Sequence, residues 1–450
     1  MSRHTYVGIL GIVFVLTFAL ASSALAAAEA VEPNIPEGFK FGTYTQKPWD
    51  GTTIRVAMVA EPRSDALAEL ADEFTELTGI NVEFNILAYP TLQEKQMVAL
   101  TQGTGAYDIV HVDCVWVGQY AGEGWTVPLE KFIEHTDPDT LALDDFIPAV
   151  LEEQGMWEGK IYGPPFIQAV FGLHYRTDIF DKYNMTVPQT WEQLRETAEA
   201  LNLKEPDVHG ITFMGRRGVQ LQCTYDNILW SYGGEWYDED YNPTINSPEA
   251  VAALEYFKTL IPFAPEGVLT YDWDENANAF AQGRAAMTIQ WQNAAPRFYD
   301  PEQSKIVGNF EFTLIPGKEQ PDGSIKRTPT FGGWSLQIPK DAPNKEAAWE
   351  FLVWASSREL DPRLAYSQPG SRISGLQDPA MQEKYIEYAG MLESLPLAKG
   401  RPRIAPYAEL ADALEVALSE AMTGEKSAQD ALDEANTKFE FILRQWGYLE

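Results

Sequence analysis

The stretch that decides the fold is TIRVAMVAEPRSDALAELADEFTELTGINVEFNILAYPTLQEKQMVALTQGTGAYDIVHV, residues 53–112. Its β-branched and alternating apolar residues predict three strands, at 53–59, 80–86 and 107–112. Apolar residues at helical spacing predict two helices between the strands, one from Ser64 to Gly79 and one from about Thr91 to Gly103. This alternation of strands and helices predicts a parallel α/β sheet.

Two loops of this unit are candidates for ligand contact. In open α/β sheets, ligands bind beyond the carboxyl ends of the strands. The loop at 60–64 follows the first predicted strand and the loop at 113–116 follows the third. We therefore expect polar and aromatic side chains of these two loops to face a ligand.

The rest of the chain predicts a second α/β unit. Roughly 420 residues follow the first 28, more than one hydrophobic core usually holds, so two domains are expected. Thr190-Trp-Glu-Gln193 is typical of a capping box, and Ser247-Pro248-Glu249 is typical of a helix start. Two further helices are predicted near the end of the chain, and residues 316–327 are predicted to form a polar loop.

The first 28 residues predict export. A short basic start, an apolar run from Tyr6 to Leu20 and an A-x-A site near residue 28 match a cleaved secretory signal peptide. A membrane anchor is the alternative, although the apolar run is short for a spanning helix. Cleavage removes Arg3 and no acidic residue, so the net charge changes from −33 to −34. A charge of this sign excludes nucleic acid and anionic membrane surfaces as expected partners.

The sequence contains no pattern typical of catalysis, metal binding or cofactor binding. The histidines that follow the signal peptide show no metal-ligand spacing, and there is no GxSxG, P-loop or GxGxxG motif. The two cysteines, Cys114 and Cys223, fall in different predicted domains, and the sequence leaves open whether they pair. We therefore predict no catalytic residue, no metal and no cofactor.

A series of motifs, taken in order, resembles a known family. They are LADEFTELTGINVEF (70–84), YDIVHVD (107–113), VPQTWEQLRETAEAL (187–201), FAQGRAAMTIQW (280–291), FGGWSLQIPKDAPNKEAAWEFLVWASS (331–357) and ALSEAMTGEKSAQDALDEA (417–435). Together they resemble the family-1 extracellular solute-binding proteins of ABC importers, the group that includes maltose-type and polyol-type receptors. Three further motifs look closest to members that handle sugar alcohols or monosaccharides: GRRG (215–218), DPEQSK (300–305) and RPRIAPY (401–407).

The resemblance implies a two-lobe periplasmic-binding-protein fold, each lobe a mainly parallel sheet flanked by helices, with the ligand cleft between the lobes. After an N-terminal extension (29–50), the expected N-terminal lobe comprises 51–165 with 316–356, and the C-terminal lobe comprises 166–315 with 357–450. The implied protein is a periplasmic monomer that closes around a sugar or sugar alcohol and delivers it to the permease subunits of an importer.

Such a ligand needs flat aromatic walls and fixed hydrogen-bonding groups. Candidates come from the two loops, from the predicted first crossing between lobes, and from segments that resemble ligand-contacting segments of the family. Arg217 is an alternative to its neighbour Arg216 as a ligand contact. The predicted ligand-binding residues are Glu61, Arg63, Asp113, Trp116, Gln168, Phe171, Arg216, Trp273, Trp291, Gly333, Trp334 and Arg372.

Two other functions remain open at this point. A receptor for a non-sugar solute, such as a polyamine or a peptide, would use the same fold, and acidic cleft residues would suit a cation. A secreted carbohydrate-active enzyme would carry a pair of carboxylates, but 66 acidic residues make such pairs by chance. Ligand-induced closure without turnover would distinguish a receptor from an enzyme.

Overall fold

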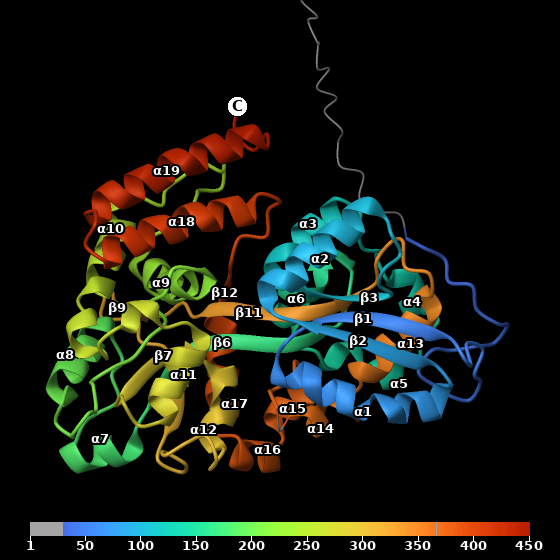
Figure 1. The fold of residues 1–450 in the computed structure, drawn as a ribbon, viewed down its shortest axis with the longest axis horizontal. Coiled ribbons are helices and arrows are strands. Elements are labelled where there is room, and N and C mark those ends of the chain that lie inside the picture. The colour runs from blue at the N-terminus through green and yellow to red at the C-terminus, as the bar shows by residue number, and fades with distance from the viewer. Residues whose placement is uncertain (1–29, 366) are drawn as a thin grey trace, which may run out of the picture.

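The computed structural model describes residues 30–365 and 367–450, so the predicted signal peptide lies outside the described residues. Two lobes lie side by side, and two strands of one sheet run from one lobe into the other (Figure 1). The predicted two-lobe α/β fold is therefore confirmed. No helix of the described part is long and apolar enough to span a bilayer.

The first lobe is built on the stretch that the sequence singled out. Strand β1 (Thr53–Val59) pairs in parallel with β2 (Asn81–Leu87) on one side and with β3 (Ile109–Asp113) on the other. Helix α1 (Pro62–Thr78) begins with proline in its first turn and ends at Gly79, whose φ of 78° suits glycine. The other helices and strands of this lobe are α2 (Tyr89–Gln102), α3 (Val117–Gly122), α4 (Glu130–Glu134), α5 (Pro138–Leu141), α6 (Pro148–Gly155), β4 (Met156–Trp157), β5 (Lys160–Ile161) and α13 (Lys345–Ala355).

Strands β6 (Pro165–Tyr175) and β11 (Thr330–Gln337) belong to both lobes. The sheet runs in the order β2-β1-β3-β11-β6-β7, and β11 is antiparallel to β3 and to β6. Its register shifts between Trp334 and Ser335, at the point where pairing with β3 begins. Two continuous strands therefore cross the junction of the lobes.

In the second lobe, β6 pairs with β7 (Met287–Trp291) and β8 (Glu311–Leu314) in antiparallel fashion. This differs from the mainly parallel sheet expected there, because β6 enters this lobe from the shared sheet and the later strands run back along it. The helices of the lobe are α7 (Thr177–Tyr183), α8 (Trp191–Leu201), α9 (Val219–Tyr232), α10 (Pro248–Lys258), α11 (Trp273–Ala281), α12 (Ala295–Tyr299), α17 (Glu387–Ser394), α18 (Tyr407–Met422) and α19 (Ala428–Gln445). The predicted capping box of α8 and the predicted Ser247 cap of α10 are both present.

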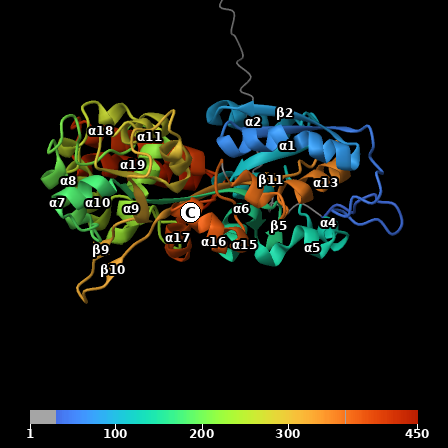
Figure 2. The ribbon, with the colours of Figure 1, turned by 90° about the horizontal axis from the view of Figure 1, so that it is seen from below.

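Two segments pack against a different lobe from the one predicted for them. The predicted polar loop at 316–327 contains a small hairpin, β9 (Lys318–Glu319) and β10 (Ile325–Lys326), whose contacts run to the second lobe (Figure 2). Helices α14 (Asp361–Leu364) and α15 (Ile373–Gln377) lie against the first lobe, and α16 (Pro379–Lys384) follows them. Asp361 of α14 and Arg372, which directly precedes α15, form ion pairs with Arg63 and Asp145 of that lobe. Lobe boundaries that fit these contacts lie later in the chain than 316 and 356.

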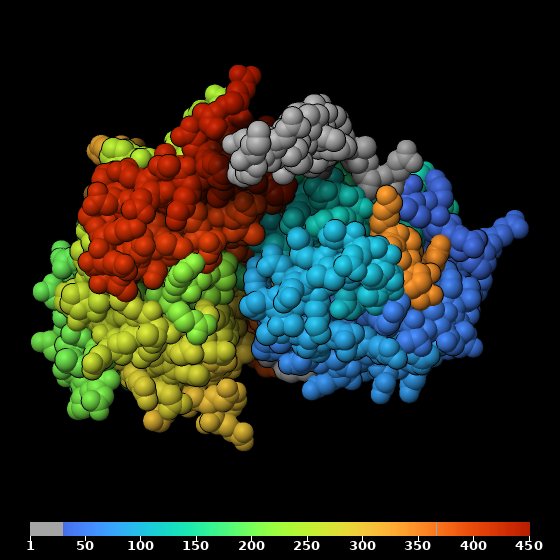
Figure 3. Space-filling view, turned by 45° about the horizontal axis from the view of Figure 1, so that its top comes forward, coloured from blue at the N-terminus to red at the C-terminus, as the bar shows by residue number. Residues whose placement is uncertain are grey.

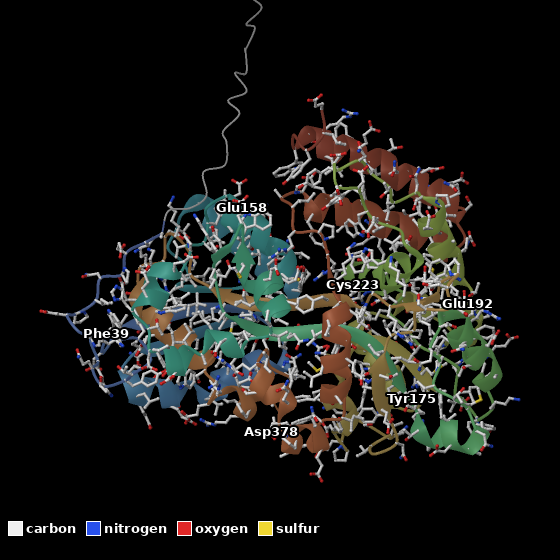
Figure 4. The ribbon with its side chains drawn as sticks, turned by 180° about the vertical axis from the view of Figure 1, so that it is seen from behind. Phe39, Glu158, Tyr175, Glu192, Cys223 and Asp378 are labelled. Atoms are coloured by element: carbon white, nitrogen blue, oxygen red, sulfur yellow. The ribbon has the colours of Figure 1, made fainter. Side chains whose placement is uncertain are left out.

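The N-terminal extension packs on the first lobe at its end remote from the second (Figure 4). The rings of Phe41 and Trp49 are stacked with centroids 5.5 Å apart, and Phe41 also contacts Phe132 of α4. The extension is therefore part of the first-lobe core and does not reach the junction between the lobes.

Candidate ligand cleft

A cavity of about 70 Å³ lies where the two lobes meet the crossing strands. A furrow between the lobes is visible on the surface of the molecule (Figure 3). The cavity is small. Its lining residues are Glu61, Tyr89, Asp113, Ala169, Val219, Gln220, Cys223, Trp273, Trp291, Asn293, Gly332, Gly333, Trp334 and Arg401.

Asp113 is the last residue of β3 and forms a buried ion pair across the junction. One carboxylate oxygen lies 3.2 Å from the Nη2 of Arg401, and the other accepts a hydrogen bond from the Tyr89 hydroxyl at 3.0 Å. The backbone N–H of Val115 donates to the same carboxylate. Charge-assisted hydrogen bonds of this kind are the stronger kind, so Asp113 is fixed in place before a ligand arrives.

Glu61 provides a second carboxyl group on the same side of the cavity. It directly precedes α1 and accepts a hydrogen bond of 2.9 Å from the side-chain amide of Gln368. Burial raises the pKa of Glu61 to about 7, with the charge of Asp113 acting in the same direction and the Gln368 hydrogen bond opposing it. Glu61 therefore changes its charge close to neutral pH.

Two tryptophans form the aromatic walls. Trp291 ends β7, packs on Phe171 with centroids 4.1 Å apart, and donates its indole N–H to Gln220 at 2.7 Å. A Cβ atom at Gly332 would lie 2.9 Å from this indole, so glycine allows the ring to approach strand β11. On β11, Trp334 packs against Tyr89 and Trp116 of the first lobe. The walls are thus set by the crossing strands.

A third tryptophan, Trp273, opens α11 at the margin of the cavity. The guanidinium of Arg297 lies 4.9 Å from the centroid of its ring. One face of this indole is therefore already occupied by a cation.

Arg401 follows the short strand β12 (Lys399–Gly400) and is buried. Besides Asp113, its guanidinium contacts the hydroxyl of Tyr407 at 3.2 Å and the thiol of Cys114 at 3.6 Å. Its Nε has no hydrogen-bond partner among the described residues, and the same is true of the side-chain oxygen of Asn293. Buried polar atoms are rarely left without partners, so this donor and this acceptor are suited to ligand hydroxyl groups.

The structure brings six of the predicted residues to the cavity. They are Glu61, Asp113, Trp273, Trp291, Gly333 and Trp334. Trp116 and Phe171 lie one layer behind, where they support the rings of Trp334 and Trp291. Gln168 is buried in β6; its carbonyl accepts from Gln292, and its side-chain amide has no partner among the described residues.

The predicted arginines do not line the cavity. Arg63 turns inward to Asp361 at 2.6 Å, and Arg372 donates to backbone carbonyls at the end of α5 and pairs with Asp145. At the surface, Arg216 forms an ion pair with Asp272, and its neighbour Arg217 forms one with Asp412. Each of these arginines forms an ion pair with a nearby carboxylate. This ion pair determines where the arginine side chain lies.

Several lining residues were not predicted from the sequence, chiefly Tyr89, Gln220, Cys223, Asn293 and Arg401. A signal existed for three of them. Arg401 opens the RPRIAPY motif, Asn293 lies two residues after Trp291, and Gln220 follows GRRG. Cys223 lies near the middle of the molecule, between the lobes (Figure 4). Both it and Cys114 are free and buried.

A two-lobed α/β fold with an aromatic-walled polar cavity at the junction of its lobes is typical of a solute receptor. The chain belongs to the family of bacterial extracellular solute-binding proteins, which it matches over residues 60–360. The family predicted from the sequence motifs is therefore confirmed.

Three relatives illustrate the similarity. An ABC transporter solute-binding protein from Agrobacterium radiobacter, solved in complex with ribitol, superimposes with a TM-score of 0.80 at 32% identity, covering 88% of this chain and 100% of that one. The mannitol-binding protein of Pseudomonas aeruginosa is 25% identical, over 88% of this chain and 94% of its own length. A probable amino-acid ABC transporter periplasmic-binding protein of Sinorhizobium fredii is 24% identical, over 90% and 92% respectively.

Proposed function

We propose that this receptor is exported to the periplasm and captures one small sugar or sugar alcohol for delivery to the permease of an ABC importer. The observation that carries the proposal is the make-up of the cavity. Trp291 and Trp334 offer flat apolar faces, while Asp113, Asn293 and Arg401 offer fixed acceptors and donors between them. This combination matches the C–H faces and hydroxyl groups of a polyol.

The relatives support a polyhydroxylated ligand. The ribitol complex and the mannitol-binding protein share nearly the whole length of this chain, and both are named for acyclic sugar alcohols. The small cavity favours a monosaccharide or a short polyol over an oligosaccharide. Binding without chemistry is part of the proposal, as is removal of the predicted signal peptide at residues 1–28.

A second candidate is a cationic solute such as a polyamine or a basic amino acid. The observation that favours it is the charge of the cavity wall, where Glu61 and Asp113 face a single arginine, Arg401. The relative named as a probable amino-acid binding protein agrees with this candidate. Because the pKa of Glu61 is about 7, its charge is only partly present at neutral pH, which weakens the attraction for a cation.

Thermal unfolding of the protein comprising residues 29–450 tests both candidates. A ligand that binds only the folded state raises the melting temperature with concentration. We expect ribitol, mannitol or a monosaccharide to raise it, with a dissociation constant of micromolar order, about −8 kcal/mol. A response to putrescine or arginine and to no carbohydrate would contradict the polyol assignment. Turnover of a glycoside by the same preparation would contradict binding without chemistry.

A further inference from the structure

One segment of the second lobe lies across the junction. Residues 399–407, KGRPRIAPY, run from β12 to the first residue of α18, and we call them the interlobe strap. In Figure 1 the chain between β12 and α18 passes between the two lobes. Both ends of the strap are held in the second lobe: Lys399 pairs with Glu235, and the ring of Tyr407 stacks on Trp236 with centroids 5.9 Å apart. The middle of the strap contacts the first lobe instead.

The middle of the strap is fixed to the first lobe by Arg403. Its Nη1 donates to the backbone carbonyls of Glu152, Glu153 and Met156, at 2.9, 3.1 and 3.0 Å, where α6 ends. Its guanidinium also lies 5.7 Å from the ring centroid of Trp157. The last carbonyls of a helix have no partner within the helix and carry partial negative charge, so they bind a cation well.

The backbone of the strap fits closely on the same lobe. The carbonyl oxygen of Arg403 lies against Gly118 of α3, where a Cβ atom would be only 1.8 Å from it. Gly400 lies in a similar way against the carboxylate of Glu153. Pro402 and Pro406 restrict φ on either side of this contact, so the strap is stiff. A displacement at Arg403 is therefore passed along the strap to Arg401.

We infer that Arg403 is a positioning residue of the ligand cavity, although it does not line it. It clasps the second-lobe strap to the end of α6, and this contact sets Arg401 against Asp113 and holds the lobes together. The inference rests on the proposed function for its effect on ligand affinity. Its effect on the distance between the lobes does not depend on the identity of the ligand.

Interlobe distance provides the test. Spin labels at Val98→Cys on α2 and Leu203→Cys after α8 report on the two lobes, because both positions are exposed and the native cysteines are buried. We expect Arg403→Met to shift the label-to-label distance toward longer values without added ligand. If the closed fraction falls to about a tenth, the affinity for ribitol or mannitol falls about tenfold. Arg403→Lys keeps the charge and is expected to restore part of both effects.

Arg363→Met is the matched control, because Arg363 forms a two-bond ion pair with Glu73 inside the first lobe. It should change neither the distance nor the affinity. If Arg403→Met does not fold, Gly118→Ala replaces it, since the added Cβ must displace the strap from α3. Unchanged distances in these strap variants would overturn the inference even if a polyol binds. If the distances are longer in the strap variants but the wild type binds no carbohydrate, the inferred role of Arg403 is supported and the proposed ligand is rejected.

Discussion

At the scale of single residues, Trp291 joins the aromatic and the polar sides of the cavity. Its ring rests on Phe171 and is held by Gln220 through the indole N–H. We expect Trp291→Ala to lower ligand affinity by about a hundredfold, as loss of a central aromatic contact commonly does, without unfolding the protein. Calorimetric titration measures this. Trp446→Ala, which removes an exposed tryptophan outside the cavity, serves as the control. Wild-type affinity in Trp291→Ala would reject the site.

Glu61 predicts a pH dependence of binding. Its ionised carboxylate is the stronger hydrogen-bond acceptor for a neutral polyol, and its pKa is about 7. Affinity should therefore rise between pH 6 and pH 8, as Glu61 loses its proton. Glu61→Gln removes the titration and should make affinity independent of pH over this interval. A variant with the same pH profile as the wild type would show that another group is responsible.

The sequence predicted the position of a side chain at the cavity where the end of a strand sets its direction. Glu61 and Asp113 lie at the carboxyl ends of parallel strands, which meet at one edge of the sheet. Their role in ligand binding stays a prediction. The positions of Arg63 and Arg372 were not predictable, because local sequence does not reveal their buried ion-pair partners, Asp361 and Asp145. Arg401 was missed for a related reason, since its partner lies almost 300 positions earlier in the chain.

At the scale of elements, helix ends were the most predictable feature. The capping box of α8 and the cap of α10 depend only on neighbouring residues, and both form as expected. Strand order was not predictable in the same way. The place of β11 between β3 and β6, with its register shift at Trp334, depends on pairing partners that are remote in the sequence.

The cap of α8 gives a prediction that separates stability from binding. Thr190→Ala removes the hydroxyl that accepts from the backbone N–H of Gln193. The free energy of unfolding should fall by about 1 kcal/mol, while ligand affinity stays at the wild-type value because α8 does not line the cavity. Urea unfolding and calorimetric titration measure the two quantities. A loss of affinity in this variant would show that α8 is coupled to the cleft.

At the scale of the whole molecule, buried carboxyl groups determine how stability depends on pH. Burial raises the pKa of several carboxyls to about 7, so the folded state binds protons between about pH 4.5 and 7 that the unfolded chain releases. The free energy of unfolding therefore falls as the pH rises through this interval. The groups are Glu61, Asp226, Glu350, Glu387 and Glu415.

Buried histidines act in the opposite direction. Burial lowers the pKa of His111 and His174 to about 3, so the unfolded state binds protons there below about pH 6.5 and stability is lost. His209 shifts in the same direction. Hydrogen bonds from Arg363 lower the pKa of Glu73, and this contribution is lost in stronger acid.

The raised carboxyls outnumber the histidines, and acid also reduces the repulsion within a chain of net charge −33. We therefore expect the melting temperature to reach its maximum at about pH 5. Scanning calorimetry between pH 4 and pH 8 measures this. A maximum at pH 7 or above would contradict the burial of these carboxyl groups.

The shared strands β6 and β11 have a consequence for how such a receptor can diversify. Gly332, Gly333 and Trp334 lie on a strand that belongs to both lobes, and they also touch the cavity. A mutation that reshapes the pocket for a new solute therefore alters the mechanical stiffness of the joint as well. At these positions, a change in the preferred solute is accompanied by a change in the rate at which the lobes open. Independent adjustment of the opening rate has to come from positions outside both the pocket and the interlobe strap, because Arg401 of the strap lines the cavity.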